Sequence, residues 1–280
     1  MERIRRSLLF VPGDRPDRIR KAATLPADVV IIDLEDGVDA SRKDEARRNT
    51  AALLAEIDFA DRETAVRINA VDSPFHADDT RALSNFPCKP DLIVVSKVET
   101  AGELLPLHDA SWVDCQWIPC IESAQSVLNA AAIARASPSI VGLLFGGHDL
   151  AADLGTVACW EPLLFARSQV LLAAAAAGID AFDAPWIDLA DQDGLTGECF
   201  RARGLGYVGK AAIHPQQLES INGCFSPSAD EMAWAQQVVA AAELGGSGAM
   251  RVNGKMVDLA TVRSARKTLA RARRLRGEND

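Results

Sequence analysis

Short apolar runs rich in β-branched residues alternate along the chain with longer segments in which apolar and charged residues recur at helical spacing. This alternation is typical of repeated strand–helix units and a parallel sheet. Eight runs predict strands, at residues 7–11, 28–34, 64–69, 91–98, 116–122, 140–146, 179–184 and 207–213. Two smaller domains are possible on length alone. Eight units in 280 residues, however, favour a closed α/β fold, the (β/α)8 TIM barrel of about 250 residues.

The segments between the runs have an apolar and a charged face. After the second run, one side of a predicted helix carries Ala46, Thr50, Leu53, Leu54 and Ile57. The charged residues expected on its solvent side are Arg42, Lys43, Asp44, Arg47 and Arg48. The segment 163–177 is nearly all apolar, so we expect another element or another subunit to cover that helix.

The strand–helix alternation stops at about residue 225. We therefore predict a barrel domain over residues 1–225 and a C-terminal helical extension over residues 226–280. The extension has only helical patterns, at 229–244 and 259–276, separated by a glycine-rich break at 245–248 and a polar stretch to Lys255. Residues 260–276 hold seven basic residues and no acid. A solvated helix end explains them better than attraction of an anionic ligand.

Composition and charge make several classes of partner and site improbable. A formal net charge of −9 disfavours nucleic acid and anionic membrane surfaces as partners. No run of about 18 apolar residues is present, and the N-terminus lacks the apolar core of a signal peptide, so we predict a cytoplasmic protein. The six scattered cysteines form no Cys-x-x-Cys pair and are expected to be reduced packing residues. A catalytic cysteine is disfavoured, and four histidines give little support to a zinc site.

Carboxylates gather where the predicted strands end. Glu35 and Asp36 follow the second run, Glu122 closes the fifth, and Asp149 follows the sixth. In a barrel these ends meet at one mouth, where active sites lie. Several carboxylate oxygens in one place suit Mg²⁺ or Mn²⁺, so Glu122 and Asp149 are candidate metal ligands. The alternative for each acid is a helix cap or a solvated loop.

Other residues near strand ends could bind a substrate. Arg67 ends the third run, and its planar fork can hold a carboxylate or alkoxide; an ion pair with Glu35 is compatible with that role. Gly146-Gly147 lets the backbone approach a ligand closely. Pro12-Gly13-Asp14-Arg15 and Lys21 could bind phosphate, although a plain turn into a helix explains them equally well.

These residues, in this order, resemble the citrate lyase β-subunit-like group of the HpcH/HpaI aldolase family. The resemblance covers about residues 5–270 and is far more specific in combination than any single motif. The motifs that carry it are Arg6-Ser7-Leu8-Leu9-Phe10-Val11-Pro12-Gly13, Asp33-Leu34-Glu35-Asp36-Gly37-Val38, Arg67-Ile68-Asn69, Lys97-Val98-Glu99, Ile121-Glu122-Ser123-Ala124 and Gly209-Lys210-Ala211-Ala212-Ile213-His214-Pro215.

The resemblance implies a barrel that forms homotrimers and cleaves a carbon–carbon bond in a 3-hydroxyacyl thioester such as citramalyl-CoA, malyl-CoA or citryl-CoA. It implies Mg²⁺, with Mn²⁺ as a substitute, on Glu122 and Asp149, and Arg67 on the keto-acid oxygen. Glu35 and Asp36 complete the implied catalytic set as partners of these groups. Related aldolases that act on free hydroxy acids carry Glu-His at this position, which favours a thioester of coenzyme A or of an acyl carrier.

The resemblance also gives a role to one residue of the C-terminal extension. Gly254-Lys255-Met256-Val257-Asp258 matches a segment that family members lay over a neighbouring subunit's barrel mouth. Asp258 would then be a catalytic acid/base supplied across the interface, and a helix N-cap is its alternative role. From the residues themselves we predict that Pro12, Arg15 and Lys21 bind coenzyme A and that Gly147 and His148 bind the substrate. Many relatives have an acidic or small polar residue in place of His148, so His148 bears on substrate choice.

Three rival functions stay open. A malyl-CoA thioesterase and an acyl-carrier-dependent citrate lyase subunit need the same metal and arginine. A non-catalytic CoA-binding protein on the same barrel belongs to another class. This last reading is disfavoured because the predicted metal ligands, Arg67 and Asp258 are all intact.

Overall fold

The protein is described by a computed structural model that covers residues 3–109, 115–245 and 249–277. The chain divides into two compact units, one made of Arg5–Asn222 and the other of Met1–Ile4 with Gly223–Asp280. Each unit is described by itself below.

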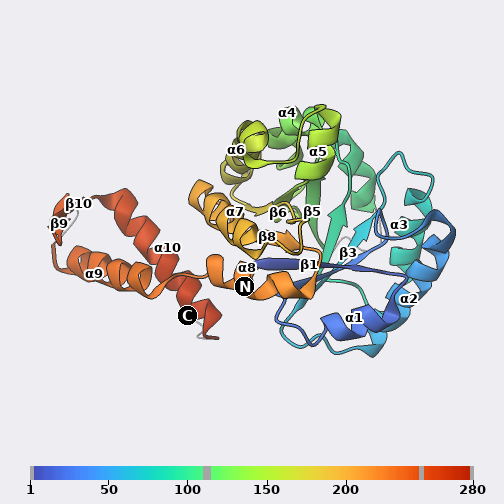
Figure 1. The fold of residues 1–280 in the computed structure, drawn as a ribbon, viewed down its shortest axis with the longest axis horizontal. Helices are drawn as coiled ribbons and strands as arrows, with labels where there is room; N and C mark the ends of the chain where they lie inside the picture. The colour runs from blue at the N-terminus through green and yellow to red at the C-terminus, as the bar shows by residue number, and fades with distance from the viewer. Residues whose placement is uncertain (1–2, 110–114, 246–248, 278–280) are drawn as a thin grey trace. The chain divides into compact units, whose positions relative to one another are not determined.

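The first unit is a closed barrel of eight parallel strands in sequential order (Figure 1). The strands are β1 Ser7–Pro12, β2 Val29–Asp33, β3 Glu63–Ile68, β4 Leu92–Val95, β5 Gln116–Ile121, β6 Gly142–Phe145, β7 Asp180–Asp183 and β8 Gly209–Ala212. β1 pairs with β2 and also with β8, where Leu8 lies opposite Ala211, and this second pairing closes the barrel. All eight predicted strands and the predicted barrel are confirmed.

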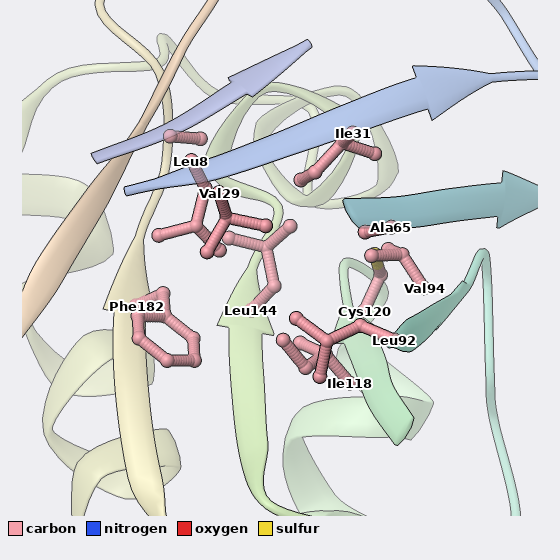
Figure 2. Packing of buried hydrophobic residues seen from close by; sticks show 11 residues of the cluster. Leu8, Val29, Ile31, Ala65, Leu92, Val94, Ile118, Cys120, Leu144 and Phe182 are labelled. Carbon is pink, nitrogen blue, oxygen red and sulfur yellow. The ribbon is translucent and has the colours of Figure 1, made fainter. Parts of the chain in front are cut away.

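Apolar side chains from all eight strands fill the barrel interior (Figure 2). The cluster consists of Leu8, Val29, Ile31, Ala65, Leu92, Val94, Ile118, Cys120, Leu144, Phe182 and Ala211. All five residues of β2 are buried, because one face of the strand lines this core and the other lies under helices. Burial on both faces explains why the second run has no polar alternation.

Helices follow the strands and surround the barrel (Figure 1). They are α1 Pro16–Ala22, η1 Ala40–Arg42, α2 Lys43–Glu56, α3 His76–Asn85, η2 Ala101–Asp109, α4 Ala124–Ile133, α5 Gly147–Asp153, α6 Trp160–Ala177, α7 Gln192–Leu205, η3 Pro215–Gln217 and α8 Leu218–Cys224.

Two helices differ from the sequence pattern. Lys43 and Arg47 of α2, expected on the solvent side, are only 6% exposed, because each has buried hydrogen-bond partners. The apolar helix α6 packs against α4 and buries Leu163 and Val170. Phe165 and Leu172 on its other side stay 72% and 65% exposed in the single chain.

The second unit contains α9 Ala229–Gly245, a hairpin of β9 Met250–Val252 and β10 Lys255–Val257, and α10 Leu259–Leu275. The expectation of helices alone is therefore wrong between residues 250 and 257. Asn253 and Gly254 form the turn with φ values of 47° and 79°, and Asn-Gly is the pair that two-residue hairpin turns favour. Residues 246–248 of the predicted glycine-rich break lie outside the described residues.

The second unit has its own apolar core. Val238, Val252, Val257 and Val262 are buried together, so the hairpin and both helices pack as one body. In the part of the chain that the structure describes, no helix is both long enough and apolar enough to cross a membrane.

Candidate active site

The carboxyl ends of the strands surround a cavity of about 380 Å³ in the barrel unit. Predicted site residues that line it are Pro12, Asp36, Arg67, Glu122, Gly147, His148 and Asp149. Glu35 is buried next to the cavity and contacts Arg67. The tertiary structure therefore gathers most of the predicted set from five different strand ends.

Arg67 is held in one orientation by two carboxylates and a ring. Its Nε and Nη2 each lie 2.6 Å from an oxygen of Asp33, and its Nη1 lies 3.0 Å from Glu35 Oε2. The guanidinium also stacks over Phe10, 4.7 Å from the ring centroid. Burial opposes the charge, but Asp33 and Glu35 outweigh it and raise the pKa of Arg67. Arg67 is therefore a fixed cation at the cavity wall.

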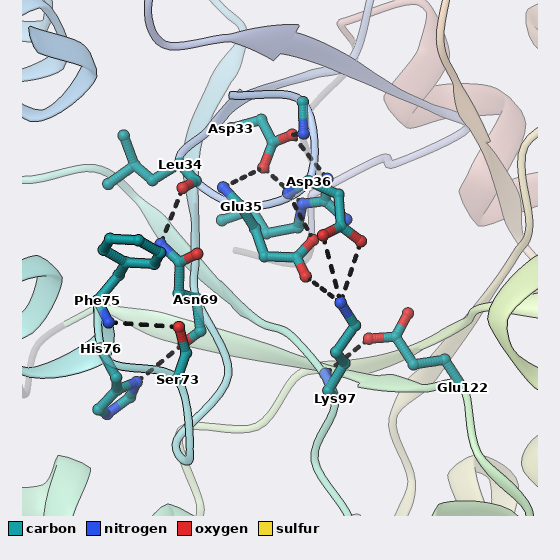
Figure 3. A network of polar contacts seen from close by, with 12 residues as sticks. Asp33, Leu34, Glu35, Asp36, Asn69, Ser73, Phe75, His76, Lys97 and Glu122 are labelled. Carbon is teal, nitrogen blue, oxygen red and sulfur yellow. Dashed lines mark hydrogen bonds and ion pairs between the residues drawn. The ribbon is translucent and has the colours of Figure 1, made fainter. Parts of the chain in front are cut away.

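Lys97 joins the acids of the site (Figure 3). Its Nζ donates to Glu35 Oε1 at 2.5 Å and to Asp36 Oδ2 at 3.1 Å. Burial raises the pKa of Glu35 despite Arg67 and Lys97. At Asp36 burial also opposes ionisation, but the hydrogen bonds from Lys97 and Glu35 prevail and lower its pKa. The two neighbouring acids thus differ in their preference for a proton.

The backbone of Lys97 also orients Glu122. Lys97 has a φ of 52°, a left-handed conformation that is unusual for a residue with a side chain. In this conformation its N–H donates to Glu122 Oε1 at 2.6 Å. No role for Lys97 was predicted, although it stands at the end of the fourth apolar run, where its position was a usable signal.

Glu122 and Asp149 form an electrostatically strained pair of carboxylates. Burial and, after it, the charge of Asp149 raise the pKa of Glu122 to about 7. Gly146 makes room for Glu122, since a Cβ at position 146 would lie 2.3 Å from Glu122 Cβ and 2.6 Å from its Oε2. The close approach of the two strand ends explains why glycine stands at this position.

This donor set fits Mg²⁺. A bound cation would relieve the repulsion between Glu122 and Asp149, both of which line the cavity. Among the described residues no group of three or more His, Cys, Asp or Glu side chains is arranged to hold a metal. Two carboxylates with water and substrate oxygens are the usual ligands of Mg²⁺, whereas structural zinc requires four protein ligands.

A second cavity of about 230 Å³ lies beside β1, α1 and the end of β8. Pro12 and Lys21 line it, as two of the three residues predicted for coenzyme A. Arg15 lines neither cavity, and its side chain is 54% exposed beside Asp14. Arg18, which was not predicted, lines both cavities. It follows Arg15 by three residues and precedes Lys21 by three, so helical spacing could have revealed it.

Phe10 and Cys120 were not predicted as site residues, and Asp33 was expected only as one acid of the cluster with Glu35 and Asp36. Phe10 and Cys120 line the main cavity, and Asp33 both lines it and binds Arg67. Each lies two residues before a predicted site residue, and the period of a strand places such pairs on one face. Burial raises the pKa of the Cys120 thiol, which therefore stays protonated and serves as a packing group.

Asp258 belongs to the C-terminal unit. It is the N-cap of α10, and its Oδ1 accepts a hydrogen bond from Thr261 N at 2.8 Å. The hydrogen bonds from the Thr261 backbone and hydroxyl lower the pKa of Asp258. The capping role is therefore present, while a role across an interface stays a prediction.

Comparisons with known proteins identify the family of the chain. Residues 6–215 match the model of the HpcH/HpaI aldolase/citrate lyase family, and residues 164–275 match a model described as a C–C bond lyase of the TIM-barrel fold. The chain is 36% identical to the citrate lyase subunit beta of Leuconostoc mesenteroides, over 96% of this chain and 93% of that protein. It is 38% identical to a (3S)-malyl-CoA thioesterase of Cereibacter sphaeroides, over 95% and 94%.

A solved structure is similar over nearly the whole chain. It is the protein CitE from Mycobacterium tuberculosis in complex with magnesium, acetoacetate and coenzyme A. The two chains share 35% identity with a TM-score of 0.83, over 96% of this chain and 98% of that one.

Proposed function

Because the chain belongs to the HpcH/HpaI aldolase/citrate lyase family, we propose that it is a magnesium-dependent lyase that cleaves a 3-hydroxyacyl-CoA into acetyl-CoA and a 2-keto acid. The observation that carries the proposal is one cavity that holds the Glu122–Asp149 pair opposite a fixed arginine. The related protein in complex with magnesium, acetoacetate and coenzyme A supports the same ligand classes.

The residues of the cavity have different roles in the cleavage reaction. Glu122 and Asp149 would hold Mg²⁺, which when bound lowers the pKa of the substrate hydroxyl and offsets negative charge on the departing keto acid. Arg67 stabilises the oxygen that becomes the ketone, since Asp33 and Glu35 keep its guanidinium charged and in place. Lys97 holds Glu35 and Asp36 beside it, so these two acids are already oriented before the reaction.

The second cavity supplies a path for coenzyme A. Arg18 and Lys21 bring two positive charges to this cavity, which shares the lining residues Phe10 and Pro12 with the main cavity. A diphosphate-bearing arm of the substrate would bind these cations, while its thioester end lies near Arg67.

Asp258 of a neighbouring subunit completes the site in this proposal, within a homotrimer. After carbon–carbon cleavage the acetyl-CoA enolate needs a proton, and in the condensation direction the same carbon must lose one. The N-cap hydrogen bonds of Asp258 favour its ionised form, which is the form that removes this proton in condensation. In cleavage the substrate hydroxyl releases one proton, and Asp258 would have to take up that proton before it protonates the enolate.

The proposal is tested by incubating the purified protein with citramalyl-CoA, malyl-CoA and citryl-CoA in parallel, with Mg²⁺, with Mn²⁺ and with a chelator. We expect chelator-sensitive release of pyruvate, glyoxylate or oxaloacetate together with acetyl-CoA from one of them. Release of free CoA with malate, and without acetyl-CoA, would identify a thioesterase instead. Thioester binding without any product would leave a CoA-binding protein or a lyase subunit that accepts the acyl group only on a carrier protein.

A further inference from the structure

A buried lysine lies beneath the loop that carries Glu35 and Asp36. Lys43, the first residue of α2, is 6% exposed and lines neither cavity described above. Its Nζ donates to the carbonyl oxygens of Leu34 at 2.7 Å and Glu35 at 2.8 Å, and to Asn69 Oδ1 at 3.0 Å. All three donors of the ammonium group are therefore used, and two of them hold the backbone of this loop.

Asn69 extends the contact to the end of β3. Its Nδ2 donates to the same Leu34 carbonyl at 2.8 Å. In Figure 3 this hydrogen bond lies on the side of the loop away from Lys97. Asp79, which is fully buried, accepts hydrogen bonds from the Asn69 backbone N–H at 2.9 Å and its side-chain Nδ2 at 2.6 Å. Arg47 Nε donates to the other oxygen of Asp79 at 2.7 Å. The lysine thus belongs to a buried polar network that joins β2, β3, α2 and α3.

The other side of the loop is held by Asp33. One of its oxygens accepts from Glu35 N and the other from Gly37 N, each at 2.9 Å. Lys43 and Asn69 bind the carbonyl groups of the loop, and Asp33 binds its N–H groups. The backbone is therefore clamped from both sides, and the side chains of Glu35 and Asp36 are left to face Arg67 and Lys97.

A charged lysine in this position lowers the stability of the fold. The three hydrogen bonds of the ammonium group go to neutral acceptors, and burial lowers the pKa of Lys43 even though the charges of Asp33 and Asp79 oppose that shift. An apolar side chain of the same length would avoid the free-energy cost of burying this charge. A surface lysine on α2 would have satisfied the helix pattern equally well. We propose that Lys43 is a positioning residue that sets the orientation of Glu35 and Asp36 through the Leu34 and Glu35 carbonyl groups.

The inference rests on the proposed function in one respect, since its catalytic readout needs turnover. The test compares wild type, Lys43→Met, and the control Ile133→Ala, which removes fully buried apolar atoms from α4. Each full-length protein is assayed at saturating Mg²⁺ on the thioester that wild type cleaves, at a temperature below all three melting points. Amide hydrogen exchange of the peptide that contains residues 34–38 is measured in parallel.

We expect Lys43→Met to lower kcat by about 10- to 100-fold with KM changed less than about threefold, as for residues that orient the groups at a reacting centre. Exchange at residues 34–38 should rise by at least about tenfold as their opening free energy falls. Ile133→Ala should lower the melting temperature without either effect. In the Glu35→Gln background, adding Lys43→Met should lower kcat by less than about threefold, because the two residues act through one orientation.

Wild-type exchange at residues 34–38 in Lys43→Met would overturn the inference. A kcat loss that multiplies in full with that of Glu35→Gln would also overturn it, since Lys43 would then act by another route. If wild type cleaves no thioester, the proposed function fails, and the exchange comparison still decides the role of Lys43.

Discussion

Glu122 should destabilise the protein when magnesium is absent. Its pKa is about 7 in the folded protein against 4.5 as the ordinary value, so between these values the folded state binds the proton that the unfolded state has lost. The contribution of Glu122 to the free energy of unfolding is then most favourable at low pH and falls as the pH rises from 4.5 to 7. At about 1.4 kcal/mol for each pKa unit, ionised Glu122 costs about 3 kcal/mol at pH 8.

The substitution Glu122→Gln removes this charge and keeps an oxygen that can accept from Lys97 N–H. In a chelator at pH 8 we expect Glu122→Gln to melt above wild type by roughly 6 to 12 °C, since about 1 kcal/mol corresponds to roughly 2–4 °C in a protein of this size. The gap should shrink toward zero as the pH is lowered to 4.5. Millimolar Mg²⁺ should raise the melting point of wild type alone, because the ion stabilises only the form that binds it.

Thermal unfolding at constant protein concentration measures both effects. Glu219→Gln, on the exposed surface of α8, removes an equal charge and should leave the melting point unchanged at both pH values. If Glu122→Gln melts at or below wild type at pH 8 without metal, burial and Asp149 do not penalise the ionised carboxylate, and a bound Mg²⁺ would have no repulsion to relieve.

Three further substitutions probe the site. Gly146→Ala should weaken Mg²⁺ binding, measured by calorimetry, by at least about tenfold, because the new Cβ would collide with Glu122. The control Gly197→Ala on α7, where a Cβ meets open space, should bind Mg²⁺ as wild type does. Equal affinities of the two variants would show that the close contact between positions 146 and 122 does not matter for the metal. Arg67→Lys should lower kcat for keto-acid release by about 10²-fold, because lysine cannot keep both bonds to Asp33; an unchanged kcat would remove Arg67 from the reaction. Asp258→Asn should leave the melting point unchanged, since asparagine caps helices as well, but lower turnover by about 10²- to 10⁴-fold; full turnover would restrict Asp258 to its capping role.

Much of the fold was predictable because patterns among residues close together in the sequence predict its strands and helices. Strands buried on both faces need unbroken apolar runs, and eight such runs with helices between them allow few architectures. The hairpin at residues 250–257 was missed because each strand has three residues, too few to show an alternating pattern, although its Asn253-Gly254 turn was a usable local signal.

The sequence by itself determined which acids and which arginine stand at the barrel mouth, because the parallel order of the strands brings their carboxyl ends together. Only the tertiary structure decided what these groups do to one another. The pKa of Glu122 depends on burial and on Asp149, which comes from another strand end. Lys43 looks like a solvent-facing residue of an amphipathic helix, and it is buried because acceptors from the segments that follow β2 and β3 meet it there. Helical periodicity describes a side chain's direction within its own helix, whereas its partners come from segments far away in the chain.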